Sequence, residues 1–178
     1  LYVRCGVKSL TEEESGRIFS LIDSLTSAID ASRNLNKDKG LIMQRAVAHS
    51  VVQNYADAIS DLTVYIQTDS TSSLAYWQRA VCQDRMNEYD ASRGEDIRLK
   101  TVGAISDLAM AIKLNPKNAY LYFDRGNLHA ENKDFARAIE DYDSAIKLDP
   151  KLAEAYYNRG IANVNLGNTD AGIADLSK

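Results

Sequence analysis

The sequence is poor in cysteine. Its two cysteines, Cys5 and Cys82, are far apart in a chain of 178 residues and form no Cys-x-x-Cys motif. Two widely spaced cysteines do not build the disulfide framework of a small secreted domain, so they leave the redox compartment open. Localisation is equally unreadable, because the chain begins Leu-Tyr-Val-Arg without a signal-peptide pattern, and we expect it to be cut from a longer protein.

A basic excess and a long apolar run are also absent. The chain has 21 lysines and arginines against 25 aspartates and glutamates, which gives a formal net charge of −4. Contacts to phosphates dominate nucleic-acid binding and usually require a basic excess, so we expect no nucleic-acid partner. No stretch of 18 apolar residues occurs, so we expect no membrane insertion.

The chain does contain a repeat of 34 residues. The pairs separated by 34 positions include Pro116 and Pro150, Arg125 and Arg159, and Gly126 and Gly160. Upstream, Arg45 precedes Arg79 by 34 positions, whereas Arg79 precedes Arg125 by 46, so one unit carries 12 extra residues. A fixed period of this length indicates an array of stacked units.

Each unit is predicted to form two helices. In the copy 119–152, the second half has apolar residues at the helical spacing i, i+3, i+4 and i+7: Phe135, Ala138, Ile139, Tyr142, Ala145 and Ile146. The polar stretch 131–134 separates the two helices, and Pro150 ends the second because a proline cannot continue a helix.

This unit resembles the tetratricopeptide repeat, whose signature residues are matched by Tyr122, Gly126, Ala138, Tyr142, Ala145 and Pro150. The last copy matches at Tyr156, Gly160 and Leu176 but has Gly172 in place of alanine, and the earlier copies have Ala46, Ala80 and Ser70 in place of the two glycines and the proline. The resemblance implies an all-α, right-handed solenoid of antiparallel helix pairs. One pair cannot bury its apolar face alone, so stacked copies share one core.

We predict five segments. They are a degenerate or partial repeat at 1–38, repeats at 39–72, 73–118 and 119–152, and a truncated repeat at 153–178. In the first segment, Ile22–Ser32 aligns with Ile139–Asp149. Tyr2–Gly6 is predicted to be the tail of a first helix, and Thr11–Glu14 a capping box.

The extra residues of the third segment fall within Glu88–Gly103. They either lengthen the turn between two helices or extend the helices themselves, with Gly94 and Gly103 as breakers. The insertion is either a neutral elaboration or a contact for a partner.

Arginine and aspartate each recur at one repeat position. The arginines are Arg45, Arg79, Arg125 and Arg159, and the aspartates are Asp61, Asp107, Asp141 and Asp175. We predict that each arginine pairs with the aspartate of its own repeat and bridges its two helices. The paired acids argue against an alternative in which the arginines form a ladder that binds anions.

The resemblance also implies a concave binding face built from the first helix of each pair. The predicted partner-binding residues are Met43, Trp77, Phe123 and Tyr157 in one column, Gln44, Gln78, Asp124 and Asn158 in the next, and Val47, Val81, Asn127 and Ile161 in a third. Apolar side chains supply buried area and amides can bind a peptide main chain, so this pattern suits a peptide, with Trp77 as its anchor. The first column could instead pack between repeats.

Some members of the family bind acidic chaperone tails through a clamp of lysine, asparagine and arginine. The matching positions here are Met43, Val47, Gln78, Tyr120 and Asp124. None is lysine or arginine, so we do not expect that specificity.

No catalytic motif or phosphate loop is present. His49 and His129 fall at one repeat position two units apart, roughly 20 Å at about 10 Å per helix layer, so they cannot share a metal ion. Packing is their expected role, and a Cys82–histidine catalytic pair is not expected. We therefore predict no enzyme and no cofactor.

The predicted function is that of a protein–protein interaction module that binds an extended or helical peptide on its concave face. The alternative is a structural spacer or oligomerisation segment of a larger assembly that uses the end faces. No predicted capping helix covers Ile173 and Leu176, so a homo-oligomer could form through the C-terminal end.

Overall fold

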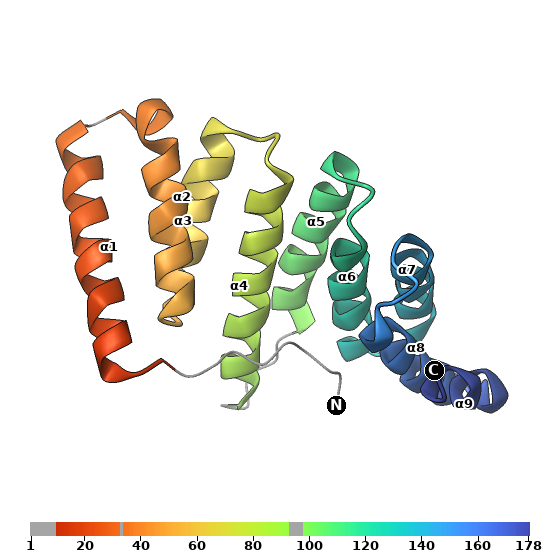
Figure 1. The fold of residues 1–178 in the computed structure, drawn as a ribbon. Helices are drawn as coiled ribbons and strands as arrows, with labels where there is room; N and C mark the ends of the chain where they lie inside the picture. Colours follow the sequence, from red (N-terminus) through yellow and green to blue (C-terminus); the bar gives the residue numbers. More distant parts are fainter. Residues whose placement is uncertain (1–9, 33, 93–97) are drawn as a thin grey trace. The chain divides into compact units, whose positions relative to one another are not determined.

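The computed structural model describes residues 10–32, 34–92 and 98–178, and these residues contain helices and no strands (Figure 1). The helices are α1 (Glu12–Ser32), α2 (Leu35–Val51), α3 (Tyr55–Thr68), α4 (Ser73–Ser92), α5 (Arg98–Leu114), α6 (Ala119–Glu131), α7 (Phe135–Leu148), α8 (Ala153–Asn165) and α9 (Thr169–Leu176). The prediction of an all-α fold is confirmed. The segment boundaries stay a prediction, and α2 begins inside the range given to the first segment.

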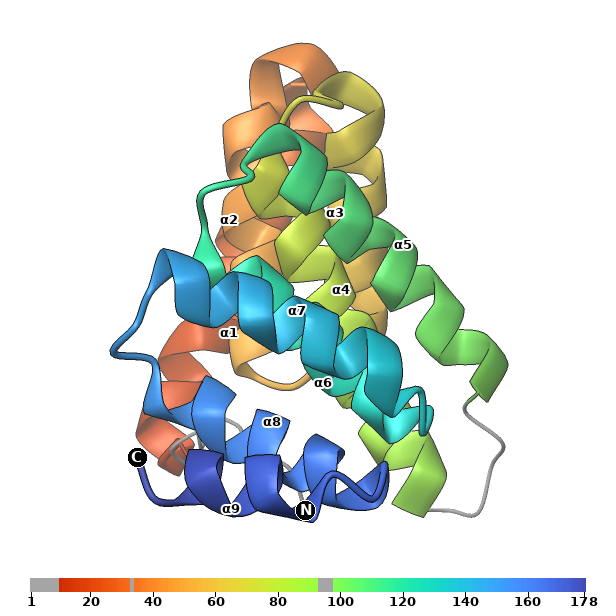
Figure 2. The ribbon, with the colours of Figure 1, turned by 90° about the vertical axis from the view of Figure 1, so that its right-hand side faces the viewer.

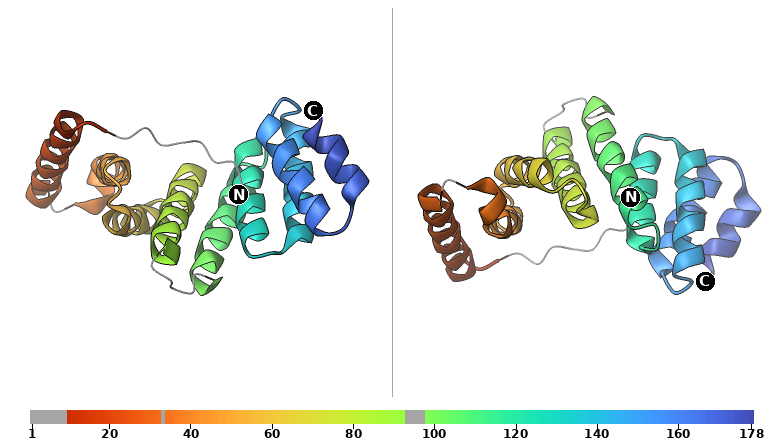
Figure 3. Two further views of the ribbon diagram at one scale, coloured as in Figure 1. Left: turned by 90° about the horizontal axis from the view of Figure 1, so that it is seen from below. Right: turned by 90° about the horizontal axis from the view of Figure 1, so that it is seen from above.

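The chain forms two compact units, each with its own core. The N-terminal unit spans Gly6–Ile97, and in it α1, α2, α3 and α4 each pack against the next helix. Figure 3 shows α1 at the edge of this unit, beside α2. The C-terminal unit includes Arg98–Lys178, and in it α5 to α9 pack in the same consecutive way (Figure 2).

The start of α1 is capped as its sequence predicts. The backbone N–H of Thr11 donates to the Glu14 carboxylate at 2.8 Å, and the N–H of Glu14 donates to Thr11 Oγ1 at 3.2 Å. This reciprocal pair satisfies two N–H groups that a helix start otherwise leaves without partners. The predicted helix tail at Tyr2–Gly6 lies outside the described residues.

Two glycines mark equivalent close crossings within the helix pairs. A Cβ on Gly126 would lie 2.8 Å from the Tyr142 ring and 3.3 Å from the Ala138 carbonyl oxygen. A Cβ on Gly160 would lie 3.0 Å from Leu176 Cγ and 3.0 Å from the Gly172 carbonyl oxygen. The same two repeat positions are met in both cases, so the copies are equivalent in structure as well as in sequence.

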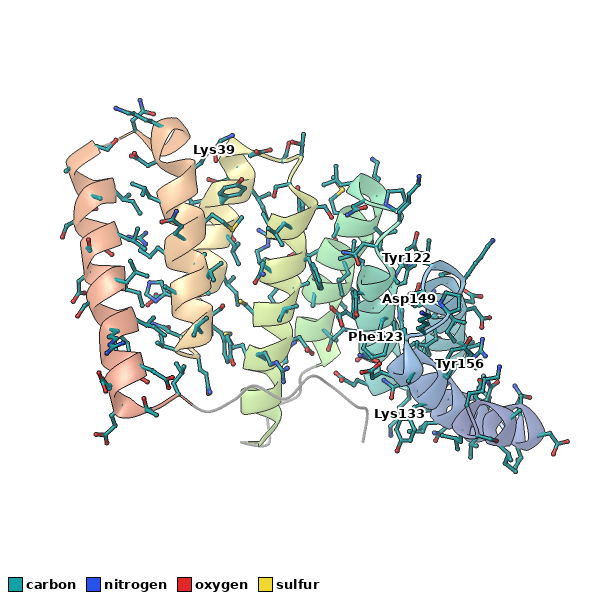
Figure 4. The ribbon with its side chains drawn as sticks, viewed as in Figure 1. Lys39, Tyr122, Phe123, Lys133, Asp149 and Tyr156 are labelled. Atoms are coloured by element: carbon teal, nitrogen blue, oxygen red, sulfur yellow. The ribbon has the colours of Figure 1, made fainter. Side chains whose placement is uncertain are left out.

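The turns inside the helix pairs repeat in the same way. Gln53, Lys133 and Gly167 occupy one repeat position and have φ values of 62°, 62° and 85°. Lys133 is labelled in Figure 4 at the turn between α6 and α7. Left-handed backbone at one place in each turn reverses the chain, and glycine adopts it without steric cost.

The extra residues of the third segment go mainly into longer helices. α4 has 20 residues against 13 in α6, and α5 has 17 against 14 in α7. The prediction that Gly103 breaks a helix is wrong, because Gly103 lies inside α5. A glycine costs a helix only about 1 kcal/mol, and the neighbouring Thr101 and Ala104 are buried, so packing outweighs that cost. Gly94 lies outside the described residues.

Candidate partner-binding surface

Three of the four predicted arginine–aspartate pairs are confirmed. In each, Nε and Nη2 of the arginine donate to the two carboxylate oxygens at 2.6–2.9 Å, and the pairs are Arg45–Asp61, Arg125–Asp141 and Arg159–Asp175. The planar guanidinium matches both oxygens at once, so each bond pair joins the two helices of a repeat in one geometry. Arg79 and Asp107 lie in different units, and their pairing stays a prediction.

The remaining guanidinium nitrogen, Nη1, reaches the helix before the repeat. It donates to Thr26 Oγ1 from Arg45 and to Thr63 Oγ1 from Arg79, each at 3.1 Å, and to the Asp143 carboxylate from Arg159. These three acceptors occupy one repeat position, so Thr26 supports the interpretation of α1 as the second helix of a degenerate repeat. The arginines therefore hold neighbouring helices together.

These contacts also keep the arginines charged. The hydrogen bond to Asp61 raises the pKa of Arg45, and the hydrogen bond to Asp141 raises the pKa of Arg125. A guanidinium that already binds a buried carboxylate through two nitrogens has little capacity left for an anion. The geometry therefore favours the predicted structural role over an anion-binding ladder.

In the N-terminal unit, most predicted partner-binding residues reach the surface. Gln44 and Val47 are exposed, and the half-buried ones are Met43, Trp77, Gln78 and Val81. Sequence reasoning missed Val51 and Leu74, which are exposed as well. Val51 is one turn after Val47 on α2 and Leu74 one turn before Trp77 on α4, so helical spacing applied once more would have found them.

In the C-terminal unit, the predicted apolar column divides. Phe123, labelled in Figure 4, is 7% exposed, and its ring centroid lies 6.1 Å from that of Tyr142 in the core. Tyr157, at the same position of the next repeat, is 43% exposed. Asp124 and Ile161 are half-buried. Of the two roles left open for this column, packing therefore holds for Phe123.

Two predicted amides are used inside the C-terminal unit. The Asn158 side-chain amide donates to Asn127 Oδ1 at 2.9 Å, and the Tyr142 hydroxyl donates to the same oxygen at 2.9 Å. Asn158 is 0% exposed and Asn127 is 4% exposed. Buried amides need such partners, and this network fixes α6 beside α8 while removing these two side chains from the surface.

The histidines and the described cysteine lie in packed surroundings. His129 is buried, with Nε2 3.9 Å from the Asp141 carboxylate, and its burial lowers its pKa. His49 Nδ1 is buried without a hydrogen-bond partner among the described residues. Burial raises the pKa of the Cys82 thiol to about 11, so the reactive thiolate is scarce at neutral pH.

Two broader searches of the described residues were negative. No group of three or more histidine, cysteine, aspartate or glutamate side chains in the described ranges is arranged to hold a metal ion. Among the helices of these ranges, none combines the length and the apolar composition that crossing a membrane requires.

Family models for the tetratricopeptide repeat match residues 109–140 and residues 127–178. Residues 109–178 are tetratricopeptide repeats. The matched region covers α6 to α9, where the tight glycine crossings and two of the arginine–aspartate pairs of these repeats lie. A search among curated protein sequences gave no match.

Solved structures extend the likeness of the repeats over the whole chain. A crystal structure of MamA is 22% identical, has a TM-score of 0.79 and covers 99% of this chain and 93% of its own. Residues 41 to the end of MamA from Desulfovibrio magneticus RS-1 are 16% identical, with a TM-score of 0.72, and cover 92% and 87%. These likenesses confirm the predicted helical solenoid fold.

A further similar structure contains a peptide. The first tetratricopeptide-repeat domain of Spaghetti (RPAP3), bound to the HSP90 peptide SRMEEVD, is 21% identical with a TM-score of 0.61. It covers 72% of this chain and 93% of its own.

Proposed function

We propose that this chain is a protein–protein interaction module that binds a peptide segment of its partner along the first helices of its repeats. The observation that carries the proposal is the apolar stripe on α2 and α4, where Val47, Val51 and Leu74 are exposed beside Trp77. Apolar side chains gathered on one face of a soluble domain mark a binding surface. A tryptophan among them is the side chain most often found to dominate binding energy.

The repeat structure of RPAP3 bound to an HSP90 peptide supports this class of partner, because the same fold there holds a short peptide. The clamp positions of this chain have no lysine or arginine, so an acidic tail is not the partner that we propose. Catalysis forms no part of the proposal.

The test is capture of a partner by the full chain, with the partner identified by mass spectrometry and then titrated as a purified protein. We expect Trp77→Ala and Val47→Lys to weaken binding by about tenfold or more, because truncating or charging a central side chain costs upwards of about 1 kcal/mol. Phe19→Lys is the matched control, since Phe19 is exposed on α1 outside the stripe. Equal binding by all variants would remove the proposal.

The second candidate is an oligomerisation or spacer segment that uses its end faces. It is favoured by Ile173 and Leu176, which are both exposed on α9. Under this alternative the measured solution mass rises with protein concentration, and Ile173→Lys abolishes the rise. A monomer at high concentration contradicts it.

A further inference from the structure

We propose that the face formed by α6 and α8 in the C-terminal unit binds a basic segment of the partner, one that carries lysine or arginine. This inference rests on the proposed function and names the chemistry of the partner at one part of that surface.

The Asn127–Asn158 hydrogen bond sets the register of the two helices. Because these two residues are level with each other, Asp124, one turn before Asn127, is level with Glu154, one turn before Asn158. α6 and α8 also contact each other directly. Two carboxylate residues therefore lie side by side on neighbouring helices, although they are 30 positions apart in the sequence.

Other side chains extend this face along both helices. Tyr120 lies one turn before Asp124 on α6, and Tyr157 follows Glu154 by three residues on α8. Tyr120 is 48% exposed and Tyr157 is 43% exposed. Exposed aromatic rings attract the ammonium group of lysine and the guanidinium group of arginine.

No cation on either helix balances these carboxylates. α6 carries Asp124 and Glu131, and α8 carries Glu154. The only basic side chains of the two helices other than His129 are Arg125 and Arg159, and both bind aspartates of the second helices. The lysines of this unit belong to other elements, so the charge of the face complements a basic segment.

An acidic segment meets the opposite situation. The peptide SRMEEVD in the similar RPAP3 structure carries two glutamates and an aspartate against one arginine. Placed on the α6–α8 face, its carboxylates would approach Asp124 and Glu154, and like charges brought together oppose binding.

The experiment compares two fluorescein-labelled peptides, SRMKKVK and SRMEEVD, by fluorescence anisotropy with the full 178-residue chain. We expect SRMKKVK to bind about tenfold or more tightly than SRMEEVD, with an affinity that falls as salt is raised from about 50 to about 300 mM. Equal affinities, or tighter binding of SRMEEVD, would overturn the inference.

Variants locate the binding. Asp124→Asn and Glu154→Gln remove one charge each, and Tyr157→Ala removes one ring, so each is expected to weaken SRMKKVK binding by about three- to tenfold. Glu140→Gln removes an equally exposed type of charge from α7 and is expected to change the affinity less than about twofold. A loss as large in Glu140→Gln as in Glu154→Gln would mean unspecific attraction and would contradict the assigned face. Thermal unfolding of each variant confirms that it is folded.

Failure of this inference is distinguishable from failure of the proposed function. Trp77 lies in the N-terminal unit, so Trp77→Ala is expected to leave SRMKKVK binding unchanged while it reduces capture of the partner. If Trp77→Ala reduces capture but SRMKKVK does not bind, the interaction module stands and the basic segment is excluded.

Discussion

Single side chains in this protein adjust to one another within a repeat. The first helix has glycine at the close crossing where the second helix presents the large Tyr142 ring, as at Gly126. In the N-terminal unit the same two positions hold Ala46 and Leu62, which pack in one cluster. A smaller partner on the second helix therefore leaves room for one extra methyl group on the first.

This adjustment predicts the effect of Gly126→Ala. The new Cβ would lie 2.8 Å from the Tyr142 ring, so we expect a loss of about 1–3 kcal/mol in the free energy of unfolding, measured with urea. The loss should be smaller in a Tyr142→Leu background, which imitates Ala46 and Leu62. Comparing the double variant with each single one corrects for the hydrogen bond that Tyr142→Leu removes. The same loss in both backgrounds would contradict this account.

The buried histidine predicts a dependence of stability on pH. Burial lowers the pKa of His129 below its unfolded value, although the Asp141 charge opposes this, so the folded protein prefers the neutral ring. The stabilisation is present above the unfolded pKa of about 6.5 and is lost as the pH falls through and below it.

The variant His129→Gln tests this, because Gln83 occupies the same repeat position. We expect its free energy of unfolding to change less than that of the original chain between pH 7 and pH 5, roughly the range in which the histidine takes up a proton. Parallel curves for the two proteins would exclude His129 as the source of the change.

At the level of helices, the arginines act as connectors. Arg45 on α2 binds Asp61 on α3 through two nitrogens and Thr26 on α1 through the third, so one side chain joins three helices. The Asp61 side chain is 9% exposed and that of Arg45 is 19% exposed. A pair at this depth has already lost most of its hydration, so its members depend on each other.

A comparison of single and double variants tests that dependence. Arg45→Met should lower the free energy of unfolding by up to about 3 kcal/mol, because it leaves the Asp61 carboxylate buried without its partner. Arg45→Met combined with Asp61→Leu should lose less than Arg45→Met alone. Arg17→Met is the matched control, since the Arg17–Glu13 pair is exposed on α1 and should contribute less than about 1 kcal/mol. If the double variant is the less stable of the two, the pair is not the origin of the effect.

At the level of the whole chain, stability is expected to be local. Each unit has a separate hydrophobic cluster, one around Leu62 and one around Tyr142, and each described helix packs mainly on its sequence neighbours. In such arrays stability is close to a sum of the repeats and their nearest-neighbour contacts.

Hydrogen exchange can test this locality. In Gly126→Ala, we expect the amide protons of α6 and α7 to exchange faster, roughly in proportion to the loss of stability, and those of α2 and α3 to change little. A uniform increase over all helices would show that the chain unfolds as one cooperative unit instead.

Periodicity was sufficient to predict the fold and part of the surface. A 34-residue spacing places Gly126 and Gly160 at equivalent crossings, and the 16-residue spacing of Arg125 and Asp141 places both on facing sides of a helix pair. These features depend on neighbours within the same repeat. Helix geometry and sequence spacing therefore specify them before any packing is known.

Exposure at the candidate surface depended instead on contacts with other side chains. Phe123 and Tyr157 occupy one repeat position, yet Phe123 packs near the Tyr142 ring in the core while Tyr157 faces outward. Asn127 and Asn158 bind each other across α6 and α8. A repeat position specifies the direction of a side chain, whereas its burial follows from the size and polarity of what the neighbouring helices place against it, and the packed structure is needed to reveal that.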